Sequence, residues 1–233
     1  MTVKVGVIGA MDVEVEALCR ALGDARVTTC ANMDFHEGVV GSTPAVVVRC
    51  NVGMVNAAAC AQVLIGRFGV THVVNTGVAG SLDAAIDIGD VVVATDAVNH
   101  LMDVCNLGYA PGQTPGLDAL AFPCDARLRE RLADAVRATC RVGVHEGRVA
   151  SGDRFVRDAE EKARIRAAFD AACCEMEGAA IAQACWLGGV PCGIVRAISD
   201  KADGSDAVDY PVFEARAAAD CAAIVRQLLE SWE

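Results

Sequence analysis

The sequence predicts an α/β protein, a three-layer α/β/α sandwich built around a twisted, mixed central sheet. Short buried-strand patterns alternate with longer helical patterns along most of the chain. This alternation is typical of a mainly parallel sheet covered by helices. After the first helical pattern, three short strand patterns follow one another without a helix between them. They indicate hairpin pairing, so we expect the sheet to be mixed rather than purely parallel.

In the first half of the chain, the elements follow from the spacing of apolar residues. Apolar runs bounded by turn residues predict strands at residues 3–10, 27–30, 34–40, 44–49, 71–77 and 88–98. Helical spacing predicts helices at residues 11–22 and 55–68, and acidic residues in the first turn of the earlier helix suit its dipole. We expect Gly41 and Ser42 to form a turn between two strands, and Gly77 to begin a turn after the strand at 71–77.

The second half of the chain continues the alternation after one irregular segment. Residues 99–122 carry glycine and proline turn signals and little periodicity, so we expect a long ordered loop or lid there. Helices are predicted at 125–140, 158–169 and 213–232, strands at 145–152 and 192–199, and a short strand entering a helix at 172–185. No linker, low-complexity tract or repeat is visible, so we expect a single domain over residues 1–233.

Composition and charge exclude several classes of function. Hydrophobic residues make up 54% of the 233 residues but aromatic residues only 4%, which predicts a large aliphatic core. The net charge of −11 has the wrong sign for a protein that binds a nucleic-acid backbone or an anionic membrane surface. No signal-peptide pattern or bilayer-length apolar run is present, and we expect a cytoplasmic protein.

The cysteines and glycine turns do not indicate a cofactor or a metal. The twelve cysteines include no C-x-x-C pair, and most lie within apolar stretches, so we interpret them as small buried hydrophobic residues. The turn GVIGAM contains G-x-x-G rather than the G-x-G-x-x-G of dinucleotide-binding folds, and the sequence has no P-loop. We therefore expect no cofactor and no metal.

Polar residues follow the apolar pattern at four predicted strand ends. These segments are GAMDVEVE (9–16), NTGVAGSL (75–82), CEMEGAA (174–180) and AISDKAD (197–203). Ligands of open α/β sheets bind beyond the carboxyl ends of the strands. The four segments together therefore predict a binding site at that edge.

Three carboxylates in these segments are candidates for acid–base chemistry. Glu14 and Glu177 each lie near the start of a predicted helix, where an acid also stabilises the helix dipole, and either role fits the sequence. Asp200 ends an apolar strand, and its structural alternative is a turn or N-cap residue paired with Lys201. Two carboxylates with different pKa values are suited to cleaving a glycosidic bond, one as acid and one as base.

The motifs GAMDVEVEAL, NTGVAGSL, SGDRF, CEMEGAAIA and VRAISDKAD resemble those of the 5′-methylthioadenosine/S-adenosylhomocysteine nucleosidases, in the same order and at similar intervals. These nucleosidases belong to the nucleoside phosphorylase superfamily, and the resemblance covers essentially the whole chain. It implies a nucleoside phosphorylase-like fold, a homodimer, a place in methionine salvage, and an adenine nucleoside and water as the reactants.

The resemblance also implies roles for individual residues. Asp200 would protonate adenine N7 with support from Ser199, while Glu14 would activate the attacking water. Glu177 would bind the ribose hydroxyls and Met176 would pack against the sugar. The remaining implied substrate contacts are Phe155 stacking on the purine, the backbone of Val156 at its edge, Tyr210 near the ribose, and Met11, Val52, Val78, Ala79, Gly80 and Glu175.

The choice between water and phosphate as the nucleophile follows from the charges near the glycine turns. Phosphorylase relatives carry arginines near the first and second glycine turns, because phosphate needs fixed cationic donors. Here GAMDVEVEA and VVNTGVAG contain neither Lys nor Arg, and Glu14 would repel phosphate. This favours a hydrolase, with a phosphate-dependent phosphorylase and a nucleoside-binding protein without turnover as the alternatives.

The segment 99–116 departs from the commoner family pattern, which leaves the 5′ substituent of the substrate open. The candidates are the methylthio and homocysteinyl groups, 5′-deoxyadenosine, and the larger tail of 6-amino-6-deoxyfutalosine. His100 in this segment is interpreted as a solvated or capping residue rather than a catalytic one.

Overall fold

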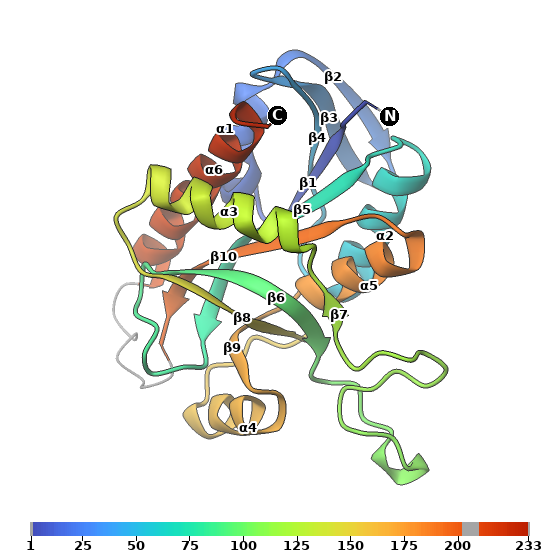
Figure 1. The fold of residues 1–233 in the computed structure, drawn as a ribbon, viewed down its shortest axis with the longest axis vertical. Coiled ribbons are helices and arrows are strands. Elements are labelled where there is room, and N and C mark those ends of the chain that lie inside the picture. The colour runs from blue at the N-terminus through green and yellow to red at the C-terminus, as the bar shows by residue number, and fades with distance from the viewer. Residues whose placement is uncertain (1, 202–209, 233) are drawn as a thin grey trace.

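The computed structural model describes residues 2–201 and 210–232, and it confirms the predicted α/β class. A mixed sheet carries helices on both faces (Figure 1). The strands in the described part of the chain are β1 (Val5–Gly9), β2 (Gly23–Cys30), β3 (Met33–Val40), β4 (Thr43–Arg49), β5 (His72–Ser81), β6 (Val91–Asn99), β7 (Phe122–Pro123), β8 (Val144–Ser151), β9 (Ala171–Glu175) and β10 (Cys192–Asp200). The helices in that part are α1 (Asp12–Ala21), α2 (Met54–Gly66), α3 (Ala126–Thr139), α4 (Ala159–Phe169), α5 (Gly178–Gly188), α6 (Tyr210–Glu230) and the short 3₁₀ helix η1 (Cys105–Leu107).

Five strands of the sheet pair in a closed circuit, and this pairing brings the candidate site residues together. Strands β1, β4 and β5 pair in parallel, and the hairpins β2–β3 and β3–β4 extend one edge. On the other side, β5 pairs with both β10 and β9, while β10, β6, β8 and β9 pair in turn, so these five strands form a closed circuit. In the register of this circuit, Gly80 of β5 lies opposite both Asp200 of β10 and Cys174 of β9.

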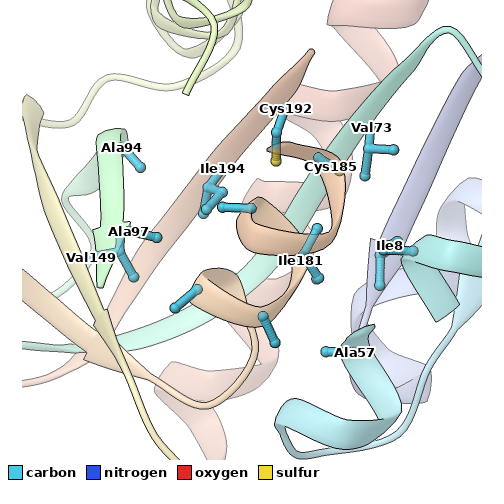
Figure 2. Close-up of a cluster of buried hydrophobic side chains, with 14 of the residues drawn as sticks. Ile8, Ala57, Val73, Ala94, Ala97, Val149, Ile181, Cys185, Cys192 and Ile194 are labelled. Atoms are coloured by element: carbon cyan, nitrogen blue, oxygen red, sulfur yellow. The ribbon is translucent and has the colours of Figure 1, made fainter. Parts of the chain in front are cut away.

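Two aliphatic clusters hold the helices against the sheet. On one face, α2 and α5 pack on each other and on the strands, as Figure 2 shows for Ala57 of α2, Ile181 of α5 and Ile194 of β10. On the other face, α1, α3 and α6 cover the sheet through residues such as Leu18 and Leu132. Burying each large aliphatic side chain contributes about 1.5–3 kcal/mol, so the aliphatic core predicted from composition stabilises all three layers.

Strand β5 corrects one prediction. The sequence predicted a turn beginning at Gly77, but β5 continues to Ser81 and pairs with β10 along the extension. Gly77 and Gly80 serve close packing rather than chain reversal, because a Cβ at either position would overlap polar side chains. The predicted turn at Gly41, which has a φ of 61°, is confirmed. Strand β2 starts four residues earlier than the predicted strand at 27–30.

The segment between β6 and β7 is largely irregular, as predicted. It includes the 3₁₀ helix η1, and the backbone N–H of Gly112 donates to the carbonyl of Met102 at 2.8 Å. Eight cysteines of the described chain are buried, in agreement with the interpretation as small core residues, whereas Cys105 is exposed. None of the helices within residues 2–201 and 210–232 is long and apolar enough to cross a membrane.

Candidate active site

A cavity of about 590 Å³ opens at the ends of β1, β5, β9 and β10. Twelve of the fourteen predicted site residues line it, together with Ala10 and Cys174. These twelve are Met11, Glu14, Val52, Val78, Ala79, Gly80, Phe155, Glu175, Met176, Glu177, Ser199 and Asp200. The four polar segments that the sequence placed at strand ends thus contribute to one cavity.

Two predicted site residues are not among the described residues that line the cavity. The side chain of Val156 is 5% exposed and packs in a small apolar cluster with Ile165 of α4 and Leu82. Tyr210 is the first residue of α6, but its side chain lies outside the described part of the chain. The predicted contacts of both residues with substrate stay predictions.

Glu14 lies in the first turn of α1 and is 1% exposed. Its Oε2 accepts from the backbone N–H groups of Ala10 at 2.6 Å and Met11 at 3.0 Å, so it caps the start of its own helix as well as lying where an acid favours the helix dipole. Its Oε1 accepts from the N–H of Val78 on β5 at 3.2 Å. Burial raises the pKa of Glu14, while Arg196 and the three N–H groups act in the opposite direction. Capping and a functional role are therefore compatible in this residue.

Arg196 is a site residue that the sequence reasoning missed. It lies on β10, is 1% exposed, and its Nη2 donates to Oδ1 of Asn75 at 2.5 Å and to Oε2 of Glu175. The same nitrogen is 3.8 Å from Oε2 of Glu177. A charged residue inside an apolar strand must have partners once buried, and this is the signal that could have identified it.

The carboxylate of Glu175 is held by protein donors. It accepts from the hydroxyl of Ser151, the guanidinium of Arg196 and the backbone N–H groups of Glu177 and Gly178. Ser151 in turn accepts from the N–H of Ala179 at 2.7 Å, which ties β8 to the start of α5. Glu175 thus orders the segment that carries its neighbours.

Glu177 occupies the N-cap position of α5, but its side chain makes no capping hydrogen bond. Instead, its Oε1 accepts from the N–H of Gly53 at 2.9 Å, which joins β9–α5 to the loop before α2. Burial raises the pKa of Glu177 to about 7, with a further increase from the neighbouring carboxylate of Glu175. Because the side chain of Glu177 does not cap α5, its position at the start of the helix is not explained by capping.

Asp200, the last residue of β10, is 7% exposed and lines the same cavity as Glu14. Its Oδ1 accepts from the hydroxyl of Ser199 at 3.2 Å, and its Oδ2 accepts from Nζ of Lys162 on α4 at 2.5 Å. The predicted alternative, pairing with Lys201, is wrong, because Lys201 forms its ion pair with Asp87. Lys162 was not singled out from the sequence.

The glycines of β5 allow the carboxylates to approach the strand. A Cβ on Gly80 would lie 2.7 Å from Oδ2 and 3.0 Å from Oδ1 of Asp200. A Cβ on Gly77 would lie 2.5 Å from Oε1 of Glu14 and would also overlap the guanidinium of Arg196. Real Cβ atoms essentially never come this close to other atoms. The carboxylates of Glu14 and Asp200 can therefore lie where they do only because residues 77 and 80 are glycines.

Apolar side chains complete the wall. Phe155 lines the cavity and is 49% exposed, and the guanidinium carbon of Arg157 lies 5.9 Å from the centre of its ring. Val52, Val78 and Met176 add aliphatic and thioether surface from other segments. A cavity that combines apolar walls with a few convergent polar groups is typical of a small-molecule site.

Three larger hollows lie elsewhere on the described surface. One, of about 840 Å³, contains the ion pairs of Arg148 with Asp96 and Arg166 with Asp83. A second, of about 1060 Å³, lies beside α1 and the β2–β3 hairpin, and a third, of about 610 Å³, lies beside β7 and the end of α5. None of them is lined by the buried carboxylates Glu14, Glu177 and Asp200, and so we assign the site to the smaller cavity.

Comparisons with known proteins agree with this geometry. A model of the phosphorylase superfamily matches residues 4–230. A protein of Exiguobacterium named 5′-methylthioadenosine/S-adenosylhomocysteine nucleosidase is 38% identical over 231 residues, which is 99% of each chain. The structure of a nucleosidase of the same name from Neisseria meningitidis, in complex with methylthio-immucillin-A, matches with a TM-score of 0.93 and 37% identity, over 98% of this chain and 99% of that one.

A structure that carries a different enzyme name is also similar. Futalosine hydrolase of Helicobacter pylori matches with a TM-score of 0.91 and 30% identity, over 98% of this chain and 97% of that chain. The family model and the full-length relatives confirm the resemblance seen in the motifs. The chain therefore belongs to the 5′-methylthioadenosine/S-adenosylhomocysteine nucleosidase family of the phosphorylase superfamily.

Proposed function

We propose that this protein hydrolyses the N-glycosidic bond of 5′-methylthioadenosine and S-adenosylhomocysteine, releasing adenine and the 5′-substituted ribose. The observation that carries the proposal is the pair of buried carboxylates, Glu14 and Asp200, which enter one cavity from different elements. Each is held by its own donors, and so one can act as base while the other acts as acid. The names of the full-length relatives support the same reaction.

Asp200 acts on the leaving group in this proposal. Adenine leaves poorly as an anion, and a proton delivered to N7 lets it leave as a neutral base. Ser199 orients one carboxylate oxygen of Asp200, and Gly80 leaves room for the carboxylate beside β5. A positioned general acid accelerates such a step by roughly 10²–10⁴-fold.

Glu14 acts on the water. Its Oε1 accepts one backbone N–H and keeps a second lone pair for a water proton. Burial raises the pKa of Glu14, which makes the carboxylate a stronger base than an exposed glutamate. As positive charge builds on the ribose, the water attacks C1′ and passes its proton to Glu14.

Glu177 and Met176 hold the sugar. Gly53 fixes Oε1 of Glu177, so the carboxylate can accept the ribose 2′- and 3′-hydroxyls. Phe155 lines the same cavity and provides the aromatic ring on which the purine stacks. Glu175 has its oxygens occupied by protein donors, and we therefore assign it to positioning Glu177 rather than to direct substrate binding.

The charges of the site favour water over phosphate. Arg196 does bring a cation near Glu14, although neither glycine segment carries one in sequence. However, three carboxylates face this one guanidinium: Glu14, Glu175 and Glu177. Three negative charges against one positive charge leave an excess of two when all are ionised, and a phosphate dianion is repelled by that excess. A phosphorylase is accordingly the less favoured alternative.

The 5′ substituent remains a choice among the methylthio, homocysteinyl and deoxy groups and the tail of 6-amino-6-deoxyfutalosine. The structural similarity to a futalosine hydrolase keeps the last of these in the substrate panel. We place residues 1–233 in a single domain, because the described strands are joined in one sheet.

A homodimer is supported by exposed apolar side chains on the two packed helices α2 and α5. Val55 is 79% exposed and Leu187 is 62% exposed, and Trp186 lies beside the latter. Light scattering behind a sizing column would give the mass of the particle in solution. A monomer at micromolar concentration would contradict the dimer. The cytoplasmic location and the place in methionine salvage stay predictions.

The test of the reaction is adenine release from each nucleoside of the panel, followed by chromatography. Asp200→Asn and Glu14→Gln should each lower kcat by at least about 10²-fold, since each removes one proton-transfer group. Matched controls are Asp134→Asn and Glu16→Gln, which change exposed carboxylates outside the cavity and should keep wild-type turnover. If wild type binds these nucleosides but releases no adenine, the protein is a binder and the proposal fails.

A further inference from the structure

Lys162 is a buried cation that has no role in the reaction proposed above. Its side chain is 1% exposed, and its ammonium lies 2.5 Å from Oδ2 of Asp200, whose side chain is 10% exposed. The same nitrogen donates to the backbone carbonyl of Lys201 at 2.8 Å. The contact therefore joins helix α4 to the strand end that carries the candidate general acid.

The position of Lys162 on α4 is one that an apolar residue would normally occupy. The buried residues of this helix are Lys162, Ile165 and Phe169, at the spacing of a core-facing stripe. Two other charged residues of α4 have different partners, Arg154 for Glu161 and Asp83 for Arg166. Burying an ammonium costs several kcal/mol unless a partner compensates, so the lysine is placed here with respect to Asp200.

We propose that Lys162 is a positioning residue that tunes the acid strength of Asp200. This inference rests on the proposed function. When Asp200 gives its proton to N7, the C1′–N9 bond breaks with its electron pair going to adenine, and Asp200 is left as a carboxylate. The ammonium 2.5 Å away stabilises that carboxylate in a poorly solvated site, which lowers the barrier to proton transfer.

The other groups that face this pair differ in how they respond to pH. Burial raises the pKa of the Cys174 thiol on β9 to about 12, so the thiol stays neutral near pH 7. The remaining facing charges are compensated by partners: Glu161 by Arg154, Glu175 by Arg196, and Lys201 by Asp87.

The test compares pH profiles of kcat/KM for 5′-methylthioadenosine in wild type, Lys162→Met and Arg166→Met. Arg166 is on the same helix and pairs with Asp83 and Asp170, so its variant loosens α4 without touching Asp200. In Lys162→Met the alkaline limb should move to higher pH by about one unit or more, and the maximal kcat should fall about tenfold or more. Arg166→Met should leave the limb in place, and Lys162→Arg should restore part of both effects.

An unchanged alkaline limb in a folded Lys162→Met variant would overturn the inference, and so would an equal movement in Arg166→Met. A second readout does not depend on turnover. Carbon NMR of protein labelled in the aspartate carboxyl carbon, with the Asp200→Asn variant for assignment, follows the protonation of Asp200 directly. The signal should titrate at higher pH in Lys162→Met than in wild type, and equal titration would refute the role of Lys162. Lys162→Gln serves if the Met variant does not fold.

Absence of adenine release in wild type would defeat the proposed function. The NMR comparison would still decide whether Lys162 holds Asp200 in its ionised form.

Discussion

Replacing Glu177 with glutamine should stabilise the fold at alkaline pH although it removes a substrate contact. Burial and the adjacent Glu175 raise the pKa of Glu177 from 4.5 to about 7. Because the folded pKa lies above the unfolded value, the protonated form is favoured in the fold. Its contribution to stability is complete below about pH 4.5 and is lost as the pH rises through about 7. Ionised Glu177 therefore costs stability at pH 8.

The size of this difference in stability follows from the ordinary and the raised pKa of Glu177. At roughly 1.4 kcal/mol per pKa unit, the difference between 4.5 and about 7 corresponds to roughly 3 kcal/mol. Glutamine resembles the protonated acid and can still accept the N–H of Gly53. Glu177→Gln should therefore match wild type near pH 4.5 and exceed its unfolding free energy by up to roughly 3 kcal/mol at pH 8.

Urea unfolding at several pH values, constant ionic strength and one protein concentration measures this difference. Glu16→Gln is the matched control, because Glu16 is exposed and pairs with the exposed Arg20 one turn along α1. It should change the unfolding free energy by less than about 0.5 kcal/mol at every pH. A Glu177→Gln protein that is no more stable than wild type at pH 8, or whose gain persists at pH 5, would refute the reasoning.

Three further substitutions test the geometry of the site. Gly80→Ala places a Cβ 2.7 Å from a carboxylate oxygen of Asp200 and should lower kcat about 10²-fold. In the control Gly66→Ala, the nearest atom to the new Cβ is on Gln62 at 3.6 Å, and turnover should stay at the wild-type level. Equal effects of the two substitutions on kcat would contradict the packing explanation. Phe155→Ala should raise KM for the nucleoside about tenfold with little loss of thermal stability, and an unchanged KM would exclude stacking. Arg196→Met leaves buried carboxylates unpaired and should lower the unfolding free energy by about 3–5 kcal/mol, which chemical denaturation can measure; a loss under 1 kcal/mol would contradict the buried network.

Polar residues at the ends of predicted strands were sufficient to identify most of the cavity. Glu14, Glu177 and Asp200 each interrupt an apolar pattern where a parallel strand ends, and parallel strand ends meet at one edge of a sheet. The family motifs then identified the apolar wall, including Phe155, which the composition alone would have assigned to the core. The helices and most strands followed from periodicity because their buried faces are strongly apolar.

The features that the sequence did not predict were missed for physical reasons. Glycine signals both a turn and a close approach of side chains to the backbone, and at Gly77 the second meaning applies. Lys162 contacts Asp200 across 38 residues, and a lysine on a surface helix normally points to solvent. Arg196 stood in a quoted motif, but its partner Asn75 is 121 residues away, so only the fold brings the two together. The closed circuit of β5, β9, β8, β6 and β10 likewise depends on pairings between distant segments.

The central claim is that water, rather than phosphate, cleaves the glycosidic bond. The most direct measurement incubates wild-type protein with 5′-methylthioadenosine, with and without phosphate, and identifies the sugar product by chromatography and mass spectrometry. The charge excess around Arg196 predicts adenine and free methylthioribose at a rate that phosphate does not increase. A methylthioribose 1-phosphate product formed only when phosphate is present would contradict the account.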